Sequence, residues 1–142
     1  MSACLLSLWL SLCLPVAPPP EVPAAAVLHA WDDQRAHAWA TGDPAALRDL
    51  YTAGSATGRA DGAMLRSWHD RGLRVTGLRT QLLALAVRDW SDDRLVLVVT
   101  DRLAGGVAVG AGVRVPLPRD RATTRRVVLR RVAGEWRVSS VV

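Results

Sequence analysis

The chain contains no lysine and no phenylalanine, and its only tyrosine is Tyr51. All 18 of its cationic side chains are therefore arginine, and six tryptophans supply most of its aromatic surface. Cysteine occurs only at Cys4 and Cys13, so the rest of the chain has no disulfide, thiolate metal site or cysteine nucleophile. An arginine bias with abundant Ala, Val and Gly is typical of a high-GC genome, and we expect an actinobacterial source.

Positive charge is only in modest excess over negative charge, with a formal net charge of +5. A nucleic-acid site needs cations gathered on one face, with stacking aromatic rings among them. The arginines here are spread along the chain, often beside Asp. The densest group contains two pairs of neighbours and consists of Arg119, Arg121, Arg125, Arg126, Arg130 and Arg131. Neighbouring residues of a strand point to opposite faces, so each pair divides between two sides. We therefore expect a solvated or ion-paired sheet surface and no nucleic-acid partner.

Residues 1–23 are interpreted as a hydrophobic leader followed by a Pro-rich spacer. The apolar run Ala3–Val16 is shorter than the ~20 residues of a membrane helix and closer to the core of a signal peptide. It lacks a positive first segment and a good cleavage site, and one account is that the true start lies upstream. We expect a signal or membrane anchor and hence a cell-envelope location, with a cytoplasmic location as the alternative. Lipidation at Cys13 is disfavoured because Leu12 is too large for the residue before a lipobox cysteine.

Two helices are predicted at the start of the remaining 119 residues, 24–142, which we interpret as one domain. Apolar residues at i, i+4 and i+7 steps predict a first helix that begins near Ala24 and stops at Gly42, the usual place for a left-handed cap. Asp43 as N-cap and Pro44 at the first helical position predict a short second helix to about Tyr51. The stretch between the two helices thus has the pattern of a stop, a cap and a restart.

A third helix and a series of strands complete the expected fold. Asp61 is expected to cap the helix after a Gly/Ser-rich loop, and Gly72 to close it, with a buried side formed by Met64, Leu65 and Trp68. The period then changes to two, and we expect strands at roughly 74–88, 94–103, 107–115, 124–132 and 135–142. Helices followed by meandering strands predict an α+β domain, with an antiparallel sheet wrapped around the helices.

The Trp-bearing first helix, the segment "GDPAALRDLY", the small-residue loop and a strand series ending in "GEWRV" together resemble the nuclear transport factor 2-like cone fold. SnoaL-like and ketosteroid-isomerase-like domains belong to this superfamily. The resemblance covers about Ala24–Val142 and implies about three helices on a curved antiparallel sheet of four to five strands, closed around an apolar pocket. Its members include isomerases, dehydratases, cyclases and non-catalytic scaffolds, so the fold does not choose among these functions.

Two polar residues are candidates for such a pocket. Asp101 shares a strand face with three apolar residues that could desolvate it, and a buried carboxylate with a raised pKa can act as acid or base near neutral pH. Tyr51 ends the second helix and could direct its hydroxyl into the cone. The alternative for Asp101, which we favour, is an ion pair with Arg102 or with an arginine of the 125–131 group. Under that alternative, Tyr51 and Asp101 contact a ligand without reacting with it.

Four tryptophans are further pocket candidates, although burial preferences favour them as core anchors: Trp31, Trp39, Trp68 and Trp136. His29, Asp33 and His37 lie on one side of the first helix but span about 12 Å, too far to grip one ion, so we expect no metal. No phosphate loop and no serine-nucleophile elbow are present, and we expect no cofactor.

Two functions of different classes follow. The first is a non-catalytic, exported or membrane-tethered cone domain that binds a partner protein or a small apolar ligand. The second is a small isomerase, dehydratase or cyclase that acts on an apolar ligand in the cone. A homodimer formed through the sheet is a further expectation.

Overall fold

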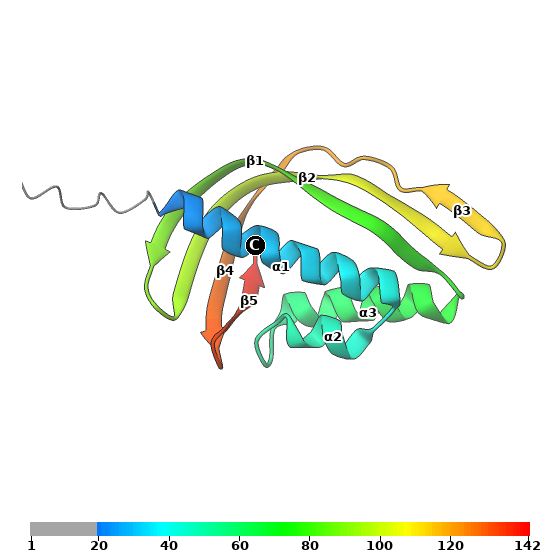
Figure 1. The fold of residues 1–142 in the computed structure, drawn as a ribbon, viewed down its shortest axis with the longest axis horizontal. Coiled ribbons are helices and arrows are strands. Elements are labelled where there is room, and N and C mark those ends of the chain that lie inside the picture. Colours follow the sequence, from blue (N-terminus) through cyan, green and yellow to red (C-terminus); the bar gives the residue numbers. More distant parts are fainter. Residues whose placement is uncertain (1–19) are drawn as a thin grey trace, which may run out of the picture.

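The computed structural model describes residues 20–142, in which three helices pack against one five-stranded antiparallel sheet. The sheet curves over the helices, and α1 lies along its concave side (Figure 1). The leader predicted from Ala3–Val16 lies outside the described residues. The elements are α1 (Glu21–Thr41), α2 (Pro44–Asp49), α3 (Ala56–Asp70), β1 (Arg74–Trp90), β2 (Arg94–Gly110), β3 (Val113–Pro116), β4 (Thr123–Val132) and β5 (Glu135–Val141).

The predicted junction between α1 and α2 is confirmed, although α1 begins at Glu21, three residues before Ala24. Gly42 has a φ of 66° and donates its backbone N–H to the carbonyl of Ala38, as a left-handed helix cap requires. The Asp43 carboxylate accepts hydrogen bonds from the first free backbone N–H groups of α2 at 2.9 and 3.0 Å. The end of α1 and the start of α2 are therefore encoded locally.

The predicted start of α3 is wrong. Ser55 caps this helix by accepting a hydrogen bond from the backbone N–H of Gly58 at 3.1 Å, and Asp61 lies well inside the helix and is buried. The serine hydroxyl already accepts a hydrogen bond at the start of the helix, whereas the Asp61 carboxylate is bonded to side chains distant in the sequence. Met64 is also misassigned, because its side chain is 57% exposed.

The strands predicted at 94–103 and 107–115 are in fact one long strand, β2, followed by the short β3. Gly105 and Gly106 do not break the strand, because β2 pairs with the equally long β1 on both sides of them. The chain turns instead at Ala111-Gly112, where both residues have positive φ. The sheet order is β1-β2-β4-β5, with β3 beside β2, so β1 and β5 are the edges of the main path.

The core lies between the concave face of the sheet and the helices. The central strands contribute Leu95, Leu97 and Leu129, each with no exposed surface, and α1 contributes Leu28 and Trp31. The sheet extends beyond β5 through a parallel bridge between Tyr51 and Val138, which ties the end of α2 to the strand. This bridge places the only tyrosine at the rim of the concave face.

Candidate functional site

A cavity of about 290 Å³ lies under α1, between the helices and the concave face of the sheet; we call it the cone cavity. Residues from seven stretches of the chain reach it, including both sequence candidates, Tyr51 and Asp101. Its walls combine apolar side chains with three carboxylates and two arginines. The lining residues are Leu28, Trp31, Asp32, Arg35, Tyr51, Thr57, Ala60, Asp61, Met64, Thr80, Asp101, Arg125, Val127, Val138 and Val141.

One wall of the cone cavity is a hydrogen-bonded triad of Arg35, Tyr51 and Asp61. The guanidinium of Arg35 donates to both carboxylate oxygens of Asp61, at 2.6 and 2.7 Å, and the Tyr51 hydroxyl donates to the same carboxylate at 2.8 Å. Burial raises the pKa of Tyr51, and the Asp61 charge raises it further. Burial disfavours the charged form of Arg35, but its bonds to Asp61 outweigh this effect and raise its pKa. The tyrosine hydroxyl therefore stays protonated, with its proton directed at Asp61.

Tyr51 is fixed in this position from three sides. The Trp31 indole packs edge-on against its ring with 5.4 Å between centroids, and the indole N–H donates to the carbonyl of Leu50 at 2.8 Å. On the other side lies Gly58 of α3, where a Cβ would stand only 2.6 Å from the tyrosine Cγ. Trp31 is thus both a core residue and part of the cavity wall.

The opposite wall carries an ion pair between Asp101 on β2 and Arg125 on β4. A terminal nitrogen of Arg125 donates to the two carboxylate oxygens of Asp101 at 2.5 and 2.7 Å, and Asp101 is 7% exposed. The sequence expectation of an arginine partner from the 125–131 group is confirmed. Arg126, its neighbour in β4, points to the opposite face of the strand, in line with the alternation of a strand. The ion pair leaves further N–H groups of Arg125 for a ligand.

Asp32 is the third carboxylate of the cavity and one that sequence reasoning missed. It makes no ion pair within 4 Å among residues 20–142, unlike Asp61 and Asp101. Burial raises its pKa to about 6; the positive charge of Arg35 opposes this shift, and the negative charge of Asp101 adds to it. Asp32 therefore exchanges its proton close to neutral pH, inside a cavity that holds two arginines.

A second cavity, of about 440 Å³, adjoins the first; we call it the side cavity. It holds two more of the predicted residues, Trp39 and Trp68, and it shares Arg35, Met64, Thr80 and Arg125 with the cone cavity. These shared side chains thus stand between the two spaces. The indole N–H of Trp39 is buried and has no hydrogen-bond partner among the described residues.

Trp136 lies apart from both cavities. It is partly buried near the turn between β4 and β5, where the Arg131 guanidinium stands 5.8 Å from its ring. Among the six residues proposed from sequence, Trp31, Tyr51 and Asp101 therefore meet in the cone cavity, and two tryptophans meet in the side cavity. Sequence reasoning missed three residues of the cone cavity: Asp32, Arg35 and Asp61. The only signal for them in the sequence is that each is a polar residue on an otherwise apolar helix face.

Other sites considered from sequence have no support among residues 20–142. His29, Asp33 and His37 are all exposed on α1, and no group of three or more potential metal ligands occurs in this part of the chain. No helix within the described region is both long and apolar enough to cross a membrane.

Comparisons with known proteins identify the fold. No protein-family model matches the chain, and no curated protein sequence matches it. The intermembrane space region of the chloroplast protein ARC6 is similar in structure, with a TM-score of 0.62 and 13% identity over 89% of this chain and 97% of that one. An NTF2-like family protein from Streptomyces avermitilis matches with a TM-score of 0.51 and 12% identity over 85% and 95% of the two chains. A Catenulispora acidiphila protein, solved in complex with S-DNPA, matches with a TM-score of 0.53 and 16% identity over 85% and 92%.

The chain therefore shares the α+β fold of these structures, one of which is described as an NTF2-like family protein, and this is the cone fold that the sequence resemblance predicted. Identities of this size establish the fold alone.

Proposed function

We propose that this protein binds a small, largely apolar molecule with one polar end in the cone cavity. The observation that carries the proposal is the enclosure of an apolar space by Leu28, Val127 and Val138 together with a few convergent polar groups. Ligand sites are commonly of this kind, and ~300 Å³ is the lower end of their volume range. A neighbour of the same fold was solved with the small molecule S-DNPA, which supports a ligand-binding role.

The polar groups of the cavity determine how such a ligand is oriented. The Tyr51 hydroxyl donates its hydrogen bond to Asp61, so toward a ligand the hydroxyl oxygen can act only as an acceptor. Arg125 offers N–H donors that its pairing with Asp101 leaves free. Asp32 is a donor below its pKa of about 6 and an acceptor above it. A ligand hydroxyl or carbonyl placed between Arg125 and Asp32 is therefore hydrogen-bonded while its apolar body contacts the aliphatic walls.

Binding of 2-naphthol, an uncharged ring with one hydroxyl, tests this proposal. Ala60 is an exposed residue of α3 at the cavity wall, and Ala60→Trp should block the space without disturbing the core. Ser67→Trp is the matched control, because Ser67 is exposed on the same helix and lines neither cavity. We expect saturable binding, followed by fluorescence or NMR, that survives Ser67→Trp and is lost in Ala60→Trp. Equal binding by all three proteins would refute the proposal.

A second candidate function is proton transfer, as an isomerase, dehydratase or cyclase would require. The observation that favours it is Asp32, which titrates near neutral pH beside the free donors of Arg125. The carboxylate would take a proton from a carbon next to a ligand carbonyl, and Arg125 would stabilise the oxygen that gains charge. Exchange of the α-protons of 2-tetralone into deuterium oxide measures this step. Acceleration that disappears in Asp32→Asn supports an enzyme; no acceleration by the wild type supports binding alone.

We also propose that the leader holds this domain at or beyond the membrane, where it could bind a partner protein. The basis is the apolar run Ala3–Val16 ahead of a Pro-rich spacer. The fold is compatible with this location, since one structural neighbour is an intermembrane space region. Fractionation of cells that express the native gene decides the point, and a wholly soluble cytosolic product with an intact leader would contradict it.

A further inference from the structure

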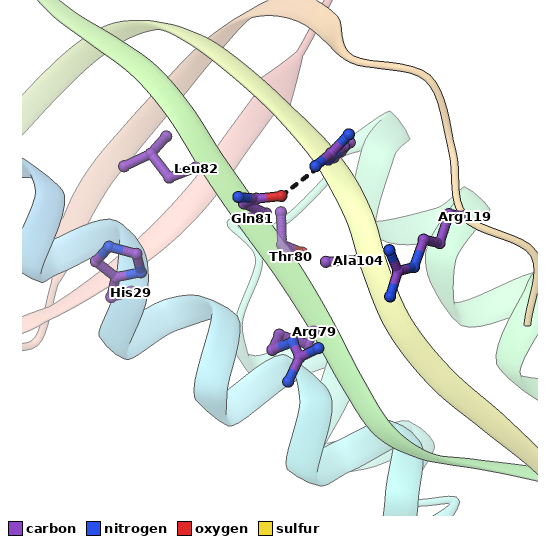
Figure 2. A pocket seen from close by; sticks show the side chains of 8 residues that line it. His29, Arg79, Thr80, Gln81, Leu82, Ala104 and Arg119 are labelled. Atoms are coloured by element: carbon purple, nitrogen blue, oxygen red, sulfur yellow. Dashed lines mark hydrogen bonds between the residues drawn. The ribbon is translucent and has the colours of Figure 1, made fainter. Parts of the chain in front are cut away.

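A third cavity, of about 520 Å³, crosses β1 and β2 outside the cone; we call it the arginine hollow. Figure 2 shows Arg79, Thr80 and Gln81 on β1, His29 on α1 to one side, and Arg119 on the other side of β2. Arg119 belongs to the segment between β3 and β4. The remaining lining residues are Leu82, Arg102 and Ala104.

Two of the polar residues of the hollow, Gln81 and Arg102, face away from the cone cavity. Gln81 and Arg102 are paired in the register of β1 and β2, next to the pair of Leu82 and Asp101. Asp101 lines the cone cavity, and neighbouring residues of a strand face opposite sides, so Gln81 and Arg102 face outward. Of all the lining residues, Thr80 alone belongs to both cavities.

The charged side chains that line the hollow are all cationic. It is lined by three arginines and a histidine and by no carboxylate, and none of these arginines makes an ion pair with residues 20–142. Asp32 and Asp33 do line a small crevice beside His29 and Arg79. Arg102 and Arg119 lie outside that crevice.

Arg102 is held by a side-chain hydrogen bond, and the backbone beside Arg119 is tied to the sheet. The Nε of Arg102 donates to the Gln81 side-chain oxygen at 2.8 Å, the dashed line in Figure 2. The backbone on both sides of Arg119 is tied to β2, through the N–H of Leu117 at 2.9 Å and that of Asp120 at 3.3 Å. Ala104, which lies between Arg79 and Arg119 in the view, gives the hollow a small side chain there.

We propose that the arginine hollow binds a small polyvalent oxyanion, of the class of an organic phosphate. Planar guanidinium groups donate paired hydrogen bonds to phosphate oxygens, and several converging arginines are the usual means of recognising this group. A volume of about 520 Å³ exceeds the size of a phosphate group and leaves room for the organic part of the ligand. The site is independent of the proposed function of the cone cavity.

Calorimetric titration of the full chain with inorganic pyrophosphate at low ionic strength tests the proposal. We expect saturable binding near one equivalent that weakens about tenfold in Arg102→Gln and again in Arg119→Gln, because each removes charge-assisted hydrogen bonds. Gln81→Leu should weaken binding less, since it frees Arg102 without removing its charge. Arg114→Gln is the matched control, because it removes the same charge from an exposed residue of β3 outside the hollow.

Three results would overturn the proposal: no saturable binding, binding unaffected by the loss of Arg102 and Arg119, or an equal loss in Arg114→Gln. The last would show attraction to the net positive charge of the chain alone. Binding of uncharged 2-naphthol should be unchanged in Arg102→Gln, so the two sites can be tested separately.

Discussion

Two glycines of α3 offer a matched test of how tightly Tyr51 is held. A Cβ on Gly58 would lie 2.6 and 2.7 Å from the Tyr51 Cγ and Cβ, whereas one on Gly62 would meet only the flexible end of Arg66 at 3.4 Å. Either replacement by alanine gains about 0.5–1 kcal/mol of helix propensity. Gly58→Ala alone adds an overpacking cost of about 1–3 kcal/mol, because the tyrosine ring cannot withdraw from Trp31 and Asp61.

The two variants should therefore differ by this overpacking cost, since the propensity gain cancels. Urea unfolding measures the difference: Gly62→Ala should be slightly more stable than the wild type, and Gly58→Ala should be about 1–3 kcal/mol less stable than Gly62→Ala. In a Tyr51→Ala background the difference should vanish, which a double-mutant cycle shows directly. If Gly58→Ala is as stable as Gly62→Ala with Tyr51 present, the close packing of the tyrosine is refuted.

Three further changes have defined outcomes. The raised pKa of Asp32 should cost the wild type about 3 kcal/mol of stability as pH rises from about 3 to about 7; unfolding at several pH values should show a flatter profile in Asp32→Asn, and equal profiles would contradict this. Asp61→Ala should cost about 3 kcal/mol in urea unfolding, because it leaves Arg35 unpaired, and a neutral effect would refute the triad. Trp31→Ala should cost about 3–5 kcal/mol and Trp136→Ala clearly less, because only Trp31 is fully packed; equal losses would refute this ranking.

The parts of the fold predicted correctly are those that short stretches of sequence encode. The junction between α1 and α2 is an example, because its residues act within a few positions of one another. Gly42 ends α1, Asp43 caps α2, and Pro44 is the first residue of α2. The strand periodicity after residue 72 was likewise enough to predict an antiparallel sheet. Gly105-Gly106 was misassigned as a turn because pairing with β1 maintains β2 across both glycines, and that pairing is a tertiary effect.

The candidate site was predicted only in part, for the same physical reason. Asp101 was found because its strand neighbours are apolar, and its pairing with Arg125 was among the stated alternatives. Asp61 was taken for a helix cap because its binding partner Arg35 lies 26 residues earlier in the chain. The burial of Asp32 depends on how α1 packs against the sheet, which no local pattern of the sequence records.

The three carboxylates of the cone cavity differ in a way that bears on its chemistry. Asp61 and Asp101 each accept bonds from an arginine, so both carboxylates are occupied. Asp32 has no such partner within the described residues and titrates at about pH 6. One acid of the cavity can therefore change its protonation state while the other two remain paired. Such a difference distinguishes a reactive group from structural ones. Ligands that present a hydrogen-bond acceptor to Asp32 should therefore bind better below pH 6, and those that present a donor should bind better above it.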